Sequence, residues 1–163
     1  MCIRDRIRTA SAGGKPKYPG WLRFAEVLPA SKKAARLRKP LFEAAFQHGG
    51  AYARADILEP VLGGRWDLIE VKSSNEVKDY HYHDVALQKY VFDGAGIQVR
   101  KCYLMHLNRE YIRRGEIDPR KLLLKEEITN EVKSILDEIG PKLRKMAAVL
   151  KNMSENFYLF RLL

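Results

Sequence analysis

Apolar segments and glycine turns alternate in the first organised part of the chain, which starts at Leu41. Three short segments, Leu41–Phe46, Ala51–Leu58 and Arg65–Lys72, have the composition of strands. Two loops, residues 47–50 and 59–64, separate them, and each loop contains a Gly-Gly pair. Short strands joined by glycine turns are typical of hairpins, so we predict an antiparallel meander of three strands.

The period changes to that of a helix near residue 84. Asp84 has the side chain of a helix N-cap, and Val85–Phe92 reads as the helix that it starts. The alternating segment Ile97–Leu107 predicts a fourth strand, and the charged residues 108–120 predict irregular structure. These elements predict an α/β fold, with a mixed, mainly antiparallel sheet flanked by helices.

A hydrophobic stripe follows in the C-terminal third. Its residues recur at helical spacing, so we expect a helix whose stripe lies in the core. The Gly140-Pro141 pair predicts an interruption, after which Pro141 starts a second helix. The members of the stripe are Ile128, Val132, Ile135, Leu136, Ile139, Leu143, Met146, Ala147 and Leu150.

The first 40 residues differ from the rest in charge. They hold 11 Lys/Arg and 2 Asp/Glu, a net of +9, out of a formal net charge of +10 for the whole chain. Residues 1–20 show no apolar periodicity, and residues 21–39 could form a short basic helix broken at Pro29. We therefore divide the chain into a basic, poorly ordered leader (1–40), a core (41–152) and a tail (153–163). The leader could contact phosphates or simply be a solvated segment.

Length and composition limit the kind of protein that this chain can be. With 163 residues, of which 46% are hydrophobic, the chain is long enough for one domain with a real core. The longest aliphatic run, Leu122–Leu124, is too short to span a membrane, and the first residues lack an apolar secretory run, which predicts a cytoplasmic protein. The two cysteines, Cys2 and Cys102, cannot build a disulfide framework or a four-thiolate site.

Candidate chemistry lies around the third predicted strand. Glu70 and Lys72 are two positions apart, so on a strand they face the same side, and a hairpin would place Asp56 beside Glu70. Two neighbouring carboxylates repel each other, and a divalent cation would relieve that cost. Their oxygens, with the Val71 carbonyl, suit Mg²⁺ or Mn²⁺, which would polarise a phosphodiester. Lys72 would orient the attacking water or offset charge on the phosphate.

The short pattern of an acid, any residue and a lysine is weak by itself. It occurs at Glu70–Lys72, Glu76–Lys78 and Glu131–Lys133, and only the first follows an acid-bearing strand. The alternative interpretation is an exposed Glu70–Lys72 ion pair with a turn carboxylate at Asp56.

A longer match adds to this interpretation. The segments Arg54–Leu58, Trp66–Ser74 and Asp84–Tyr90 resemble the PD-(D/E)xK nuclease superfamily. Within it they are similar to the RecB-like branch, which includes the CRISPR-associated RecB-like exonucleases. Residues 71–107 resemble one bacterial group of RecB-like proteins almost residue for residue. The resemblance extends over about residues 41–150 and implies a restriction-endonuclease-like core and a metal-dependent DNA nuclease.

The resemblance also implies roles for single residues. Asp56 and Glu70 would bind Mg²⁺ or Mn²⁺ together with the Val71 carbonyl, and Lys72 would be the catalytic lysine. Gln88 matches the glutamine of the branch, which helps to place DNA or the lysine.

Two further positions match less closely. The branch has a tyrosine one helical turn after the glutamine, where this chain has Phe92, and Tyr90 could substitute for it. Glu43 matches an acidic position of the first strand, although it could instead pair with Arg54 across the hairpin.

The chain departs from the branch in two respects, and its first residues are unusual. No histidine precedes His48, so the histidine metal ligand of the branch has no counterpart. An iron–sulfur cluster, which some relatives hold through four cysteines, cannot be built by this chain alone. The start MCIRDR resembles translated sequencing-adapter read-through. We therefore expect a fragment of a longer protein.

Three functions follow and all stay open. The first is a metal-dependent nuclease domain that hydrolyses DNA. The second is a non-catalytic nucleic-acid-binding or accessory module with a degenerate nuclease site. The third is a purely structural domain within a larger repair or defence protein. His81 and His83 are expected to shape the helix entry or to contact a phosphate rather than to bind a metal.

Overall fold

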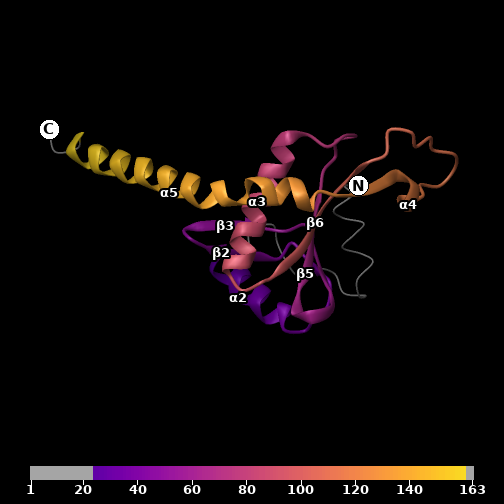
Figure 1. Cartoon of the computed structure of the whole chain (residues 1–163), viewed down its shortest axis with the longest axis horizontal. Helices are drawn as coiled ribbons and strands as arrows, with labels where there is room; N and C mark the ends of the chain where they lie inside the picture. The colour runs from indigo at the N-terminus through magenta and orange to yellow at the C-terminus, as the bar shows by residue number, and fades with distance from the viewer. Residues whose placement is uncertain (1–23, 161–163) are drawn as a thin grey trace.

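The computed structural model describes residues 24–160 of the chain. It is a mixed α/β fold in which helices flank a five-stranded sheet, as the sequence predicts (Figure 1). The elements in chain order are α2 (Phe24–Ala35), β1 (Leu41–Phe42), β2 (Ala45–His48), β3 (Ala51–Arg54), β4 (Ile57–Pro60), a 3-10 turn (Leu62–Gly64), β5 (Trp66–Val71), α3 (Asp79–Gly94), β6 (Val99–Leu107), α4 (Pro119–Leu122), β7 (Leu123–Glu127) and α5 (Thr129–Phe160).

The main sheet has the strand order β1-β4-β5-β6-β7. Strands β5 and β6 run parallel, because the chain between them crosses over through helix α3. The three other pairs, β1 with β4, β4 with β5 and β6 with β7, are antiparallel. The predicted mixed, mainly antiparallel sheet is therefore confirmed.

The predicted three-stranded meander is wrong in its first two strands. Each of them splits in two, so that β2 and β3 form a separate hairpin while β1 and β4 join the main sheet. The chain leaves the main sheet at Glu43, whose φ of 56° is outside the strand region, and returns at Asp56. The split lets Phe46 turn inward, where its ring meets that of Phe92 on α3 edge to face at 5.4 Å.

Helix α3 begins earlier than the sequence predicts. Its first residue is Asp79, and Lys78 rather than Asp84 is the N-cap residue. The backbone N–H of Lys78 donates to Nδ1 of His81 at 3.1 Å, so a local histidine contact starts the helix five residues before the predicted cap. This confirms the expected role of His81 at the helix entry.

The folded core includes part of the predicted leader. Residues 1–23 lie outside the described residues, but α2 packs on the β2–β3 hairpin, where the N–H of Ala45 donates to the buried Ser31 hydroxyl. The predicted break at Pro29 does not occur, since this exposed proline sits inside α2. A proline removes one helical hydrogen bond, and the packing of the helix outweighs that loss.

Helix α5 continues through Gly140-Pro141, so the predicted interruption is also wrong. Pro141 removes the hydrogen bond to the carbonyl of Asp137, and both residues are exposed, so water can replace the missing donor. Only the first half of the hydrophobic stripe lies in the core, where Val132 and Ile139 are buried against the rest of the domain. From Met146 onward the described part of the stripe is exposed.

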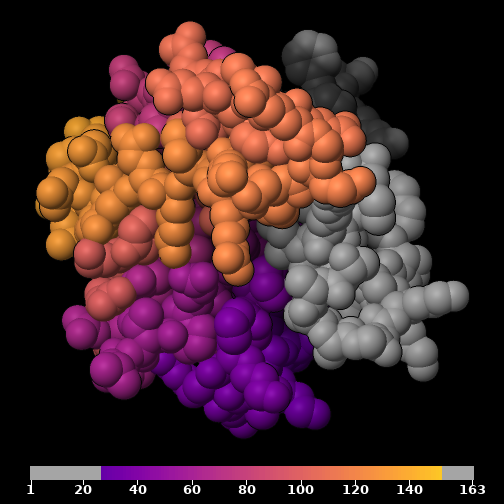
Figure 2. Space-filling model, turned by 90° about the vertical axis from the view of Figure 1, so that its right-hand side faces the viewer, coloured from indigo at the N-terminus to yellow at the C-terminus, as the bar shows by residue number. Residues whose placement is uncertain are grey.

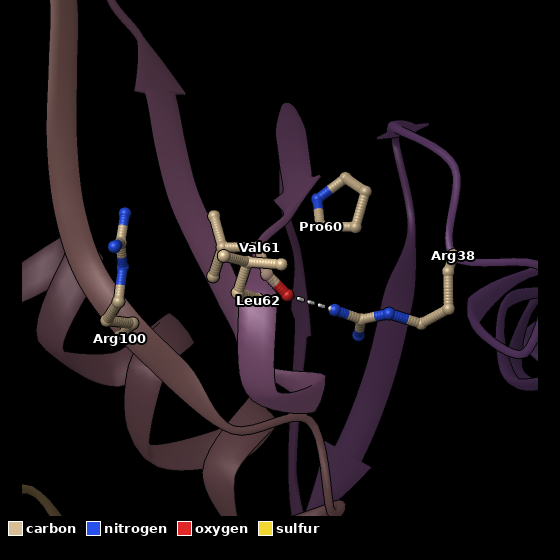
Figure 3. A pocket seen from close by; sticks show the side chains of 5 residues that line it. All are labelled: Arg38, Pro60, Val61, Leu62 and Arg100. Carbon is tan, nitrogen blue, oxygen red and sulfur yellow. Dashed lines mark hydrogen bonds between the residues drawn. The ribbon is translucent and has the colours of Figure 1, made fainter.

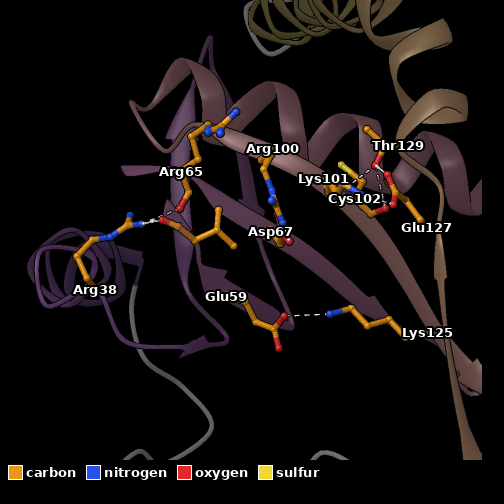
Figure 4. A network of polar contacts seen from close by, with 11 residues as sticks. Arg38, Glu59, Arg65, Asp67, Arg100, Lys101, Cys102, Lys125, Glu127 and Thr129 are labelled. Carbon is orange, nitrogen blue, oxygen red and sulfur yellow. Dashed lines mark hydrogen bonds and ion pairs between the residues drawn. The ribbon is translucent and has the colours of Figure 1, made fainter. Parts of the chain in front are cut away.

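Strand β7 has no counterpart among the predicted elements. It pairs with β6. The segment between them, predicted to be irregular over residues 108–120, is irregular up to residue 118, where the short helix α4 follows. This segment lies at the top of the face in Figure 2. Exposed ion pairs join side chains of β7 to β4 and β6 (Figure 4). Lys125 reaches Glu59 of β4 at 2.9 Å, and Glu127 accepts from Lys101 of β6 at 2.7 Å. Because the side chains of the strand are mostly exposed, no hydrophobic pattern marks it.

Gly94, in the last turn of α3, packs so closely on the hairpin that a Cβ atom there would overlap the His48 ring. We expect Gly94→Ala to lower the free energy of unfolding by about 1–3 kcal/mol, because the ring or the helix must move. Denaturant unfolding measures this loss. The double variant His48→Ala/Gly94→Ala should recover part of it, and an unchanged stability of Gly94→Ala would contradict the close packing.

Candidate functional site

Strands β4 and β5 bring the predicted carboxylates together. Ile57 pairs with Ile69 in the antiparallel register, so Asp56, just before β4, lies opposite Glu70, near the end of β5. Oδ2 of Asp56 accepts a hydrogen bond from the N–H of Val71 at 2.8 Å. The hairpin therefore places Asp56 beside the Glu70–Lys72 segment, as the sequence predicts.

Glu70 is buried and is held from two sides. Its Oε1 lies 3.0 Å from Nζ of Lys72, and its Oε2 accepts from Nε2 of Gln88 at 2.8 Å. Burial and the nearby charge of Asp56 raise the pKa of Glu70, and the contacts with Gln88 and Lys72 offset only part of that rise. A negative charge at Glu70 is therefore costly, and a cation beside it would lower the cost.

Gln88 leaves one polar atom unsatisfied. The side chain projects from α3 and is only 9% exposed, and its Oε1 has no hydrogen-bond partner among the residues that the structure describes. A buried acceptor without a partner is costly, so such atoms are rare in folded proteins. The amide nitrogen of Gln88 donates to Glu70, so its Oε1 atom is an unused hydrogen-bond acceptor held close to the Glu70 carboxylate.

Lys72 is shared by two carboxylates. Its Nζ lies 3.0 Å from Oε1 of Glu70 and 3.0 Å from Oδ2 of Asp84. Burial by itself would lower the pKa of Lys72, but the hydrogen bond with Asp84 and the charge of Glu70 outweigh it, so the pKa is raised. Lys72 therefore carries a positive charge throughout the neutral pH range.

Asp84 is the site residue that the sequence interpretation misses. It was assigned to a helix cap, but it lies inside α3, one helical turn before Gln88. Residues four apart on a helix share a face, so the spacing of Asp84 and Gln88 was a usable signal once the helix was known to begin earlier.

His81 lies close to Lys72, but its side chain has a structural role at the start of α3. It is 2% exposed, and burial together with the charge of Lys72 lowers its pKa, which keeps the ring neutral at pH 7. Its Nδ1 accepts the N–H of Lys78 at the helix start. These contacts give His81 a structural part at the edge of the site.

Two other positions, Tyr90 and Phe92, are engaged in packing, whereas Glu43 lies opposite Asp56. Tyr90 packs its ring against His48 at 5.4 Å. Phe92, at the place of the tyrosine of the branch, is fully buried in the core. The Glu43 carboxylate lies 3.0 Å from Nε of Arg54, as the alternative interpretation expected, although the N–H of Glu43 donates to the carbonyl of Asp56 at 3.1 Å.

The oxygen donors available to a metal are the carboxylates of Asp56 and Glu70 and the carbonyl of Val71. Within the part of the chain that the structure describes, no group of three or more His, Cys, Asp and Glu side chains is arranged to hold a metal ion. The costly charge on Glu70 and the unpartnered oxygen of Gln88 nevertheless fit a hard divalent cation, whose other ligands would be waters.

A hollow of about 530 Å³ lies at the other end of β5 (Figure 3). Its lining includes Arg38 and Arg100, but both guanidinium groups are engaged. Arg38 donates to the carbonyls of Val61, Gly64 and Arg65, and Arg100 forms two hydrogen bonds with Asp67. We therefore place the candidate site at the carboxylate end of the strand.

The raised pKa of Glu70 predicts a pH-dependent stability. The folded state binds the Glu70 proton more tightly than the unfolded state does, so stability is lost as the pH rises from 4.5 through the folded-state pKa. Glu70→Gln removes this loss, and we expect a higher melting temperature than wild type at pH 7. The difference should shrink towards pH 4.

Thermal unfolding followed by circular dichroism, with a chelator present, measures this difference. Glu59→Gln is the matched control, because the Glu59 carboxylate lies in an exposed pair with Lys125 and should affect the melting temperature far less. A Glu70→Gln protein that melts below wild type at pH 7 would show that the Lys72 attraction outweighs the burial cost.

No helix between residues 24 and 160 has the length and apolar character needed to cross a bilayer. Comparisons of the chain with protein-family models, with curated proteins and with solved structures found no match.

Proposed function

We propose that this chain is a metal-dependent nuclease domain of the cytoplasm that hydrolyses phosphodiester bonds of DNA. One observation carries the proposal. Four polar side chains meet at one end of β5. Lys72 and Gln88 each lie within hydrogen-bonding distance of the Glu70 carboxylate. The Asp56 carboxylate accepts from the N–H of Val71, the residue after Glu70. An exposed surface ion pair would not need a buried glutamate or a buried glutamine.

The carboxylates and the Val71 carbonyl would hold Mg²⁺ or Mn²⁺. When bound, such an ion polarises a phosphodiester and lowers the pKa of a coordinated water. The role of Asp56 and Glu70 is to supply negative oxygens whose mutual repulsion favours cation binding. The hydrogen bond from the Val71 N–H fixes the orientation of the Asp56 carboxylate for that task.

Lys72 supplies fixed positive charge. Because its pKa is raised, the ammonium group stays protonated at neutral pH, which makes it unsuited to act as a general base. Its contribution is to offset the negative charge that develops on the phosphate during attack. Asp84 and Glu70 each lie 3.0 Å from Nζ and hold the ammonium group in one place.

Gln88 orients the site from α3. Its amide nitrogen fixes Glu70, and its free Oε1 can accept from a water or complete the coordination of a cation. DNA as the substrate is supported by charge, since residues 1–40 carry a net of +9 and the neutralisation of phosphates dominates binding to nucleic acids.

The test is cleavage of end-labelled single- and double-stranded DNA by the full chain with Mn²⁺ or Mg²⁺. We expect degradation that requires the cation and stops with a chelator. Glu70→Gln should abolish it, because the cation loses a charged ligand, while Glu59→Gln should cleave at the parental rate.

A folded wild-type chain that binds DNA in a salt-sensitive way but cleaves it with neither cation would overturn the proposal. The accessory binding module, the second function that the sequence leaves open, would then be the better description. A Glu70→Gln protein that cleaves at the wild-type rate would show that the activity comes from elsewhere.

A further inference from the structure

The second half of helix α5 has an apolar face that nothing in the described structure covers. The first half packs on α3, whereas the part beyond Leu143 projects away from the body of the domain (Figure 1). Met146, Val149 and Leu150 are 63%, 53% and 66% exposed. With Lys142 and Lys145 they line an apolar hollow of about 540 Å³. Adjacent exposed side chains of this size mark an interaction surface.

The sequence of α5 follows a heptad repeat across this face. Ile139, Leu143, Met146 and Leu150 are spaced alternately by four and three residues, which is the spacing of the a and d positions of a coiled coil. In the sequence the same spacing continues at Met153, Phe157 and Phe160, up to the last residue of α5. An ordinary surface helix has no reason to keep its apolar positions in this register after it has left the core.

The occupant that fits this face is a second α5 helix. The flanking e and g positions of the repeat decide which partner a coiled coil accepts, because charges there attract or repel. Beyond Leu143 the e and g positions are Ala147, Val149, Ser154 and Asn156, and all of them are uncharged. The charged residues Arg144, Lys145, Lys151 and Glu155 occupy outer positions of the repeat.

We propose that α5 mediates homodimerisation, by packing its Leu143–Leu150 face against the same face of a second copy of this chain. No like charges meet along the seam in either orientation of the helices, so the apolar face is self-complementary. A helix selected for a different partner would carry charged e and g residues to specify it. The surface is separate from the carboxylate site, so the inference does not depend on the proposed nuclease activity.

Sedimentation velocity of the full chain over a range of concentrations tests the proposal. We expect a monomer–dimer equilibrium for wild type. Met146→Glu/Leu150→Glu should raise the dissociation constant by at least about 100-fold, since each substitution puts a charge into the apolar seam of both copies. Because both side chains are exposed in the monomer, the variant should still fold, and circular dichroism checks this.

The matched control is Ala148→Glu/Asn152→Glu. It also places two glutamates four residues apart on α5, but at outer positions of the repeat, and should dimerise like wild type. Salt gives a second measurement. Each chain has a net charge of +10, so added salt should strengthen an apolar dimer by screening the repulsion between the chains.

Three outcomes would overturn the proposal. The first is a wild-type chain that stays monomeric up to about 100 μM, a concentration well above the dissociation constants of ordinary specific complexes. The second is a dimer that persists in Met146→Glu/Leu150→Glu, because the contact would then lie on another surface. The third is a dimer that weakens with added salt, since that behaviour indicates ion pairs rather than an apolar seam.

Discussion

Replacing Lys72 with methionine is expected to lower the rate of Mn²⁺-dependent DNA cleavage by about 10²–10³-fold, the usual cost of losing one preorganised group that stabilises transition-state charge. The methionine keeps most of the aliphatic stem, so packing beside Glu70 is largely preserved. What is lost is the ammonium group held at 3.0 Å from both Glu70 and Asp84. Single-turnover cleavage of labelled DNA measures the effect.

Lys101→Met is the matched control. Lys101 lies on the neighbouring strand β6 in an exposed pair with Glu127, so the same substitution should leave the rate unchanged. Calorimetric titration with Mn²⁺ separates the roles further. Asp56→Ala should lose binding of the cation, whereas Lys72→Met should keep it, since Lys72 supplies no metal ligand. A Lys72→Met protein that cleaves at the rate of wild type would refute the assignment of this lysine.

Truncating Phe92 to alanine is expected to lower the free energy of unfolding by about 3–5 kcal/mol, the usual cost of removing a buried aromatic ring. Phe92 is fully buried, and its edge-to-face contact with Phe46 joins α3 to the β2–β3 hairpin. Chemical denaturation measures the loss.

The effect should also reach the candidate site, because α3 carries Gln88 and Asp84. We expect Phe92→Ala to lose cleavage activity at a lower temperature than wild type does, in parallel with unfolding. Leu62→Ala is the control, since Leu62 is 92% exposed and its truncation should change stability by less than about 0.5 kcal/mol. An equal loss of stability in both variants would contradict the buried position of Phe92.

The position of Phe92 bears on the resemblance to the RecB-like branch. The branch has a tyrosine at this place, and the apolar ring here faces the core rather than the carboxylates. Tyr90 does not take over the role, because its ring packs on His48 at the hairpin turn. Asp84, one turn before Gln88, is instead the α3 side chain that contacts Lys72, while Gln88 contacts Glu70.

Local patterns in the sequence were sufficient to predict many of the helices and strands and part of the candidate site. The alternating segments predicted β5 and β6, and the helical spacing predicted α3 and the first half of α5. The order of Asp56, Glu70 and Lys72 along a hairpin predicted that their side chains meet, because the register of two antiparallel strands follows from their sequences. A signal of this kind depends only on residues that are close along the chain.

Other features of the fold and of the site depend on contacts between distant parts of the chain, and only the tertiary structure shows them. The first two predicted strands split between two sheets because Phe46 finds its partner on α3, nearly 50 residues later. Strand β7 pairs with β6 through the backbone, and its side chains are mostly exposed, so no local apolar pattern indicates it. Helix α3 begins at Asp79, where the N–H of Lys78 donates to His81. Asp84 therefore lies inside the helix, on the same face as Gln88, rather than at its cap.

The hydrophobic stripe of α5 is the clearest example of a feature that the sequence predicts only in part. The sequence by itself determined that residues 128–150 form an apolar face, and periodicity cannot tell which part of that face the domain covers. The structure shows that Val132 and Ile139 are buried and that Met146 and Leu150 are exposed. The physical reason is that burial depends on which surface lies opposite, and α5 crosses α3 with its first half and then extends past it (Figure 1).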